Sequence, residues 1–250
     1  MASIEKFQHQ IINAMARSCA DMVDFTDDPA KPPNAEYLLT VNVAKEIRNL
    51  NYSAGDPYDI RLEEHTEQFA RNCLFPSKFV GHPLAHVSTK FRLGTPKINR
   101  NGRIDVAVYE NIPNNGYFGA QPICAIELKG LNPKMSSALS DMRRNLEFFR
   151  VSGNTGGSVL RFSIFAALHS FKRSSDEDRV QANEVKLKEK YQKALAQLGS
   201  THDISVDIQV HTISKELVGR VLNEGEHKVL DTSAIHHFAG IIVTFRAKEV

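Results

Sequence analysis

Two neighbouring segments of the chain place isolated charges inside otherwise apolar runs. Asp105 stands between Ile104 and Val106, and Glu127 and Lys129 lie two positions apart in the apolar run 122–129. Residues two apart on a strand share a face, so Glu127 and Lys129 are expected to project side by side. Charges on such strands are costly to bury unless they are paired or bind a metal. If the two segments pair, Asp105 and Glu127 converge on one point beside Lys129.

The chemistry open to this group is that of a hard, oxygen-rich metal site. Two carboxylates suit Mg²⁺ or Mn²⁺ rather than zinc. Lys129 is a compact positive charge that can orient or deprotonate an attacking water, or stabilise the charge of a transition state. We favour orientation and charge stabilisation over a strict general-base role. The alternative is a salt bridge from Asp105 or Glu127 to Lys129 in an inactive domain.

Two other acid-x-Lys triplets lack this setting. Glu184 and Lys186 fall in a charged helical pattern, where residues two apart point to different sides. Glu226 and Lys228 follow Gly225 in a polar stretch that is typical of a loop. Only the triplet at Glu127 is therefore a candidate site.

The elements that must position the candidate site follow from the hydrophobic periodicity. Residues 58–63 alternate like a strand but could instead open a helix that continues to Cys73. The strands 103–109 and 122–129 are joined by a turn-rich stretch, which predicts an antiparallel pair. The other predicted elements, in chain order, are helices 4–23, 36–50 and 134–149, a strand 159–169, a helix 177–198, and strands 204–213 and 238–245.

Composition excludes several classes of protein. The 250 residues are 42% hydrophobic and 24% charged, which is typical of a globular protein and not of a disordered one. No apolar run approaches the ~18 residues of a membrane span, so no membrane partner is expected. The charged start of the chain and three scattered cysteines without C-x-x-C predict a cytoplasmic protein with no thiolate metal site. The net charge of +2 means that any polyanion site must be local.

The segments 103–108 and 123–130 resemble the two halves of the PD-(D/E)XK nuclease motif. The resemblance covers roughly residues 36–170 and departs from the motif at Ile104, where proline is usual. It implies an α/β, restriction-endonuclease-like fold with a mixed central sheet flanked by helices. It also implies metal ligation by Asp105, Glu127 and the carbonyl oxygen of Leu128, with Lys129 as a catalytic residue. We expect an N-terminal helix and linker over 1–34, a nuclease core over 35–174 and a C-terminal helix-plus-strands extension over 175–250.

Members of this superfamily also carry an acid on the helix that precedes the sheet. Glu46, late in the helix 36–50, is the best candidate for this catalytic role. Glu63, on the possible strand, is the rival. The third possibility is that neither residue has this role. An exposed helix charge is the structural alternative for Glu46, which lies between Lys45 and Arg48.

Basic residues gather before the strand that bears Asp105. No acid occurs from Gly81 to Ile104, and this stretch leads directly into the proposed metal site. Such a stripe can bind backbone phosphates, although a solvated loop is the alternative. The candidate nucleic-acid-binding residues are Lys90, Arg92, Lys97, Arg100 and Arg103, with Lys134, Arg143 and Arg144 on the following helix.

The sequence thus predicts a Mg²⁺- or Mn²⁺-dependent endonuclease that hydrolyses phosphodiester bonds in DNA. By analogy with other nucleases of this kind, two copies are expected to cut the two strands as a homodimer. The alternatives are a non-catalytic nucleic-acid-binding or scaffold protein of the same fold, and a nuclease effector gated by a ligand or partner.

Overall fold

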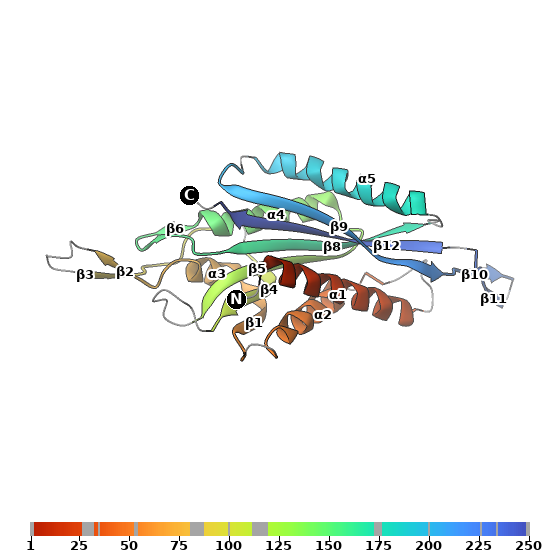
Figure 1. The fold of residues 1–250 in the computed structure, drawn as a ribbon, viewed down its shortest axis with the longest axis horizontal. Helices are drawn as coiled ribbons and strands as arrows, with labels where there is room; N and C mark the ends of the chain where they lie inside the picture. The colour runs from red at the N-terminus through yellow and green to blue at the C-terminus, as the bar shows by residue number, and fades with distance from the viewer. Residues whose placement is uncertain are drawn as a thin grey trace.

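The protein is mixed α/β, with one six-stranded mixed sheet at its centre and helices on both faces (Figure 1). This architecture is seen in a computed structural model of the chain. The coarse fold class predicted from the sequence is therefore confirmed. The structure describes residues 3–26, 33–34, 36–52, 55–80, 88–99, 101–111, 120–172, 177–199, 201–225, 227–233 and 235–248.

The central sheet has the strand order β1-β4-β5-β8-β12-β9. β5 and β8 pair in parallel, and the other neighbours pair antiparallel. Its strands are β1 (Tyr58–His65), β4 (Arg103–Glu110), β5 (Gln121–Leu131), β8 (Phe162–Lys172), β9 (Ile204–Val218) and β12 (Ile235–Ala247). Three short two-stranded ribbons accompany it: β2 (Ser77–Val80) with β3 (Ser88–Phe91), β6 (Ser152–Gly153) with β7 (Gly156–Gly157), and β10 (Val221–Glu224) with β11 (His227–Leu230).

Helices cover both faces because each strand of the sheet centre is apolar on both sides. In Figure 1, α1 and α2 lie below the sheet and α5 lies above it, and α4 shares a core with α5 on the face away from α1 and α2. Alternate residues of β5 divide between the two cores: Ile126 and Leu128 pack towards α1 and α2, whereas Ala125 packs towards α3 and α4. The helices are α1 (Ile4–Asp24), α2 (Glu36–Asn49), α3 (Thr66–Asn72), α4 (Met135–Arg150) and α5 (Glu177–Leu195), with a 3₁₀ turn η1 (Ala196–Leu198).

The sequence predicted most of these elements but missed part of their detail. The antiparallel pairing of β4 with β5 is confirmed, as are the helices α1, α2, α4 and α5. The ambiguity at residues 58–73 resolves into both alternatives, since β1 runs directly into α3. The segment around Lys228 was predicted as a loop and forms strand β11, while Glu226 lies outside the described residues. In the described part of the chain, no helix is long and apolar enough to span a membrane.

The N-terminal helix is part of the core of the domain. Phe7, Ile11 and Met15 of α1 are fully buried against the sheet, and Gln8 donates a hydrogen bond of 3.0 Å to Thr244 on β12. We therefore expect Ile11→Ala to lower the free energy of unfolding by about 2–4 kcal/mol, because it removes buried atoms and leaves a cavity. Urea unfolding checks this, with Ile12→Ala as the control because Ile12 is only partly buried. Equal losses for the two variants would contradict the packing of α1 described above.

Candidate active site

Asp105 of β4 and Glu127 of β5 lie on neighbouring antiparallel strands of the sheet, and their carboxylates have different hydrogen-bond partners. The β4–β5 ladder ends at the pair of Val106 with Ile126, and Asp105 and Glu127 are the next residues beyond that pair on each strand. The Oδ2 atom of Asp105 accepts a hydrogen bond of 2.6 Å from the backbone N–H of Leu128. The structure thus places the two acids on neighbouring paired strands, and their joint binding of one metal ion stays a prediction.

Glu127 is a fully buried carboxylate whose charge is compensated by an arginine from α4. Both of its oxygens accept hydrogen bonds from the Arg144 guanidinium, through Nε at 2.7 Å and through a second, short contact. Arg144 also pairs with Asp141, one helical turn earlier, at 3.2 Å. Burial raises the pKa of Glu127 well above its ordinary range, and the hydrogen bonds from Arg144 offset only part of this effect.

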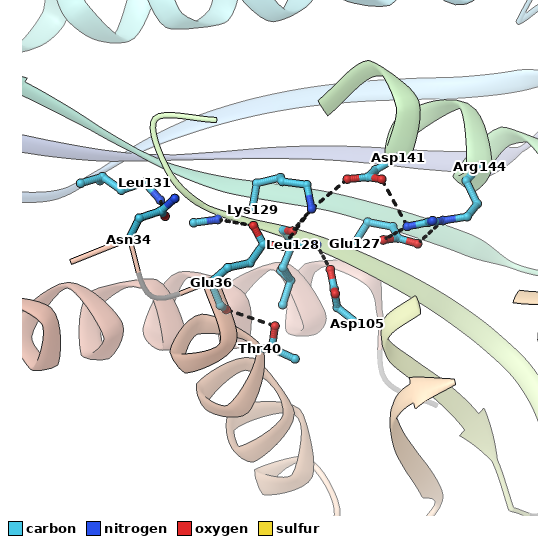
Figure 2. A network of polar contacts seen from close by, with 11 residues as sticks. Asn34, Glu36, Thr40, Asp105, Glu127, Leu128, Lys129, Leu131, Asp141 and Arg144 are labelled. Carbon is cyan, nitrogen blue, oxygen red and sulfur yellow. Dashed lines mark hydrogen bonds and ion pairs between the residues drawn. The ribbon is translucent and has the colours of Figure 1, made fainter. Parts of the chain in front are cut away.

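Lys129 lies between two carboxylates that come from different helices (Figure 2). Its Nζ atom is 2.9 Å from Glu36 Oε1 at the start of α2 and 3.0 Å from Asp141 Oδ2 on α4. It also donates a hydrogen bond of 3.1 Å to the carbonyl oxygen of Leu128. Burial would lower the pKa of Lys129, but the hydrogen bonds and charges of Glu36 and Asp141 raise it above its ordinary value. Lys129 is therefore an ammonium ion in this arrangement.

Gly130 allows the start of α2 to approach β5 closely enough for this contact. A Cβ atom at this position would overlap the Asn34 side chain and would lie 3.3 Å from the Glu36 Cα. The backbone N–H groups of Gly130 and Leu131 donate to Glu36 at 3.3 Å and to Asn34 at 2.7 Å. The end of β5 thus holds the beginning of α2 through main-chain donors that a larger residue would block.

The group contains more carboxyl groups than cationic side chains. It contains four carboxylates, from Glu36, Asp105, Glu127 and Asp141, and two cations, from Lys129 and Arg144. Burial also raises the pKa of Asp105, to about 6, and the hydrogen bond from Leu128 and the charge of Lys129 counter this only in part. A divalent cation would compensate these carboxyl groups when they are ionised.

The oxygen atoms of this group are of the type that binds such an ion. In the structure, however, Glu36, Glu127 and Asp141 form ion pairs with Lys129 and Arg144. Asp105, Glu127 and the Leu128 carbonyl supply the oxygen ligands that Mg²⁺ and Mn²⁺ prefer. No group of three or more His, Cys, Asp or Glu side chains among the described residues is already arranged to hold a metal. An ion bound here would have to compete with Arg144 for Glu127 and with Lys129 for the Leu128 oxygen.

The structure corrects the prediction for the helix acid. Glu46 is buried and pairs with Arg17 of α1 at 2.9 Å and with Asn49 at 3.0 Å, and it makes no recorded contact with Lys129. Glu36, ten residues earlier on α2, makes that contact instead; at about 1.5 Å per residue the two acids start about 15 Å apart along the helix. The rival Glu63 occupies the β1 position opposite Asp105, but its backbone is left-handed, with φ of 53°, and forms no ladder pair there.

The predicted phosphate-binding residues separate into two sets. Arg92 and Arg144 are engaged inside the protein, because Arg92 donates to the Leu74 carbonyl at 2.9 Å and Arg144 holds Glu127, so the prediction is corrected for both. The exposed members are Lys90, Lys97, Arg103, Lys134 and Arg143. Of these, Lys97 and Arg143 line a common hollow of about 380 Å³. Arg100 lies outside the described residues.

Two of the carboxylates in the group were missed from the sequence. Asp141 and Arg144 lie three residues apart on α4, and both are buried, as is the neighbouring Asn145. A charged pair at helical spacing inside the apolar stripe of α4 was a signal that could have found them. Glu36 has no such signal, because its contact with Lys129 joins positions 93 residues apart.

No family model matches the chain, and no match was found among curated proteins or solved structures.

The raised pKa of Asp105 predicts that the metal-free protein is stabilised by removing this charge. The pKa is 3.8 ordinarily and about 6 in the folded chain, so the folded state binds more protons between these values and loses stability as the pH rises. The loss of folding stability caused by the buried Asp105 charge is absent below pH 3.8 and complete above about pH 6. Asp105→Asn should therefore raise the free energy of unfolding by as much as about 3 kcal/mol at pH 7 and by little at pH 4.

Urea unfolding in EDTA at several pH values measures this difference. Asp203 is the matched control of opposite sign, because a hydrogen bond from Arg150 lowers its pKa. Asp203→Asn should not stabilise the protein at pH 7. An Asp105→Asn effect that is independent of pH would contradict burial as the cause of the raised pKa.

Proposed function

We propose that this protein is a metal-dependent endonuclease of the restriction-endonuclease-like fold that hydrolyses phosphodiester bonds in DNA. The observation that carries the proposal is the placement of Asp105, Glu127 and Lys129 on two paired strands of one sheet, within the polar network described above (Figure 2). The hydrogen bond of Asp105 to the Leu128 backbone ties the two strands of the group together. The number of charged side chains in the group also supports the proposal. Burying several charged groups costs stability, and a catalytic role would explain why the protein keeps them.

In this proposal Asp105, Glu127 and the Leu128 carbonyl hold Mg²⁺ or Mn²⁺. The bound ion would neutralise charge on the scissile phosphate and lower the pKa of a water molecule. The excess of carboxylates over cations supports this assignment. Asp105 has one carboxylate oxygen on the Leu128 N–H, which fixes the orientation of the group.

Lys129 is proposed to orient the attacking water and to stabilise negative charge at the reacting phosphate. Its raised pKa keeps it protonated, which favours charge stabilisation over proton abstraction. Glu36 and Asp141 act as positioning residues, because each holds the Nζ atom from a different side. Arg144 occupies Glu127 in the metal-free arrangement and so keeps the buried carboxylate compensated.

One alternative has an observation in its favour. Both oxygens of Glu127 are already bound by Arg144, and this is also what a non-catalytic DNA-binding protein of the same fold would retain. A nuclease gated by a ligand or partner would retain it too, until Arg144 is displaced. Cutting both strands of a duplex would need two such sites, so we propose a homodimer as the active form.

The nuclease proposal predicts that supercoiled plasmid DNA is nicked or linearised with Mg²⁺ or Mn²⁺ and remains intact in EDTA. Lys129→Ala should lower the rate by about a hundred-fold or more, because it removes a cation aimed at the charge that develops during the reaction. Gel electrophoresis of the plasmid at timed intervals measures the rate.

The matched control is Lys186→Ala, which alters an exposed lysine in the acid-x-Lys triplet on α5. This variant should cleave like the wild type. Cleavage that survives in Lys129→Ala would place the activity elsewhere or in a contaminant. No cleavage with either ion would favour the non-catalytic or gated alternative.

The two acids of α2 give a second test of the site. Glu36→Gln should lower the cleavage rate about ten-fold or more, because Lys129 loses one of the charges that hold it in place. Glu46→Gln should instead lower stability, since it removes a buried carboxylate that pairs with the partly exposed Arg17, and should leave the rate per folded molecule unchanged. Rates normalised to the folded fraction from circular dichroism separate the two effects. The reverse result would restore Glu46 as the helix acid.

A further inference from the structure

The β2–β3 ribbon, formed by Ser77–Val80 and Ser88–Phe91, projects from one end of the molecule (Figure 1). It belongs to its own two-stranded sheet and is not hydrogen-bonded into the central sheet. All four residues of β3 are exposed. An isolated two-stranded ribbon is marginally stable in water, so an ordered arm of this kind needs a further source of stability.

The base of the ribbon is fixed to the domain by polar contacts. Arg92 extends the ladder through its backbone N–H, which donates to Pro76 at 2.9 Å, and its side chain holds Leu74. Asn154 donates to the carbonyl of Phe91 at 2.7 Å, and Thr155 donates to that of Phe75 at 2.7 Å. These contacts hold the base of the ribbon against the domain.

The ribbon places two lysines directly opposite each other. Lys78 pairs with Lys90 in the antiparallel register, and both side chains are exposed. Like charges at directly opposed positions destabilise a two-stranded sheet. An anion that binds both lysines would remove this repulsion and stabilise the ribbon at the same time.

The surrounding sequence shares this charge. From residue 68 to residue 104 the chain contains no Asp or Glu, whereas acidic residues outnumber Lys and Arg in the rest of it. The basic residues of this segment are Arg71, Lys78, Lys90, Arg92, Lys97, Arg100 and Arg103. The segment ends one residue before Asp105, so the basic stretch and the candidate active site are continuous along the chain.

We infer that the β2–β3 ribbon is an arm that binds duplex DNA, with Lys78 and Lys90 contacting backbone phosphates. This inference takes its substrate from the proposed nuclease function and assigns the contact that would hold that substrate. A two-stranded ribbon has the width that the major groove accepts. Phe91 and Leu93, which are 68% and 77% exposed, lie at the base of the arm, where apolar contact with the duplex adds to the ionic one.

Fluorescence anisotropy with a labelled DNA duplex of about 20 base pairs tests the arm in the full-length protein. EDTA is present throughout, so that binding is measured without cleavage. Lys78→Glu and Lys90→Glu are made separately, because each places a glutamate opposite a lysine and should leave the melting temperature unchanged or raised. Each should weaken binding at least about ten-fold and make it less dependent on salt, because phosphate contacts are lost.

Lys186→Glu on α5 is the control and should bind like the wild type. Its lysine is exposed, and α5 packs against β9 at the edge of the central sheet, outside the β2–β3 ribbon. Unchanged affinity in both ribbon variants overturns the inference, and so does a wild-type protein that does not bind the duplex. The first result would leave Phe91 and Leu93 to contact a protein instead. Plasmid cleavage is scored separately, so a failed arm with intact cleavage can be told from a failed nuclease proposal.

Discussion

The burial of Glu127 at the centre of the sheet is the constraint on which the rest of the site depends. A carboxylate at this depth needs a partner, and α4 supplies one as Arg144. Arg144 also forms an ion pair with Asp141, and Asp141 forms a second ion pair with Lys129. Lys129 then draws Glu36 to the end of β5, where Gly130 leaves room for it. One charge on one strand thus fixes the placement of two helices relative to the sheet.

This chain of pairs also limits what the site can do without a ligand. Removing one partner of a buried ion pair costs about 3–5 kcal/mol, because the other charge is left uncompensated. Arg144 and Lys129 therefore act as internal counterions for carboxylates that would otherwise resist folding. A divalent cation in the same place would take over part of that role and release the Arg144 guanidinium from Glu127, which would leave it paired with Asp141.

The sequence was informative where the signal was local and uninformative where it depended on folding. Alternation in 103–109 and 122–129 predicted β4, β5 and their antiparallel pairing, because strand geometry and pairing follow from a period of two. Glu36 could not be chosen over Glu46, since both are acids on one helix and only the approach of α2 to Gly130 separates them. Arg144 was assigned to a phosphate surface because a sequence does not tell an exposed arginine from a buried one.

The parallel pairing of β5 with β8 has a consequence for the order in which the parts of the site are synthesised. Parallel neighbours need a crossover connection, and here the crossover is α4, which carries Arg144. During synthesis the β4–β5 hairpin is complete before α4 exists, so Glu127 enters the growing chain without its counterion. Glu127 can therefore pair with Arg144 only after the crossover helix has been made. The order of the elements along the chain thus delays closure of the core around the acid until its arginine has been made.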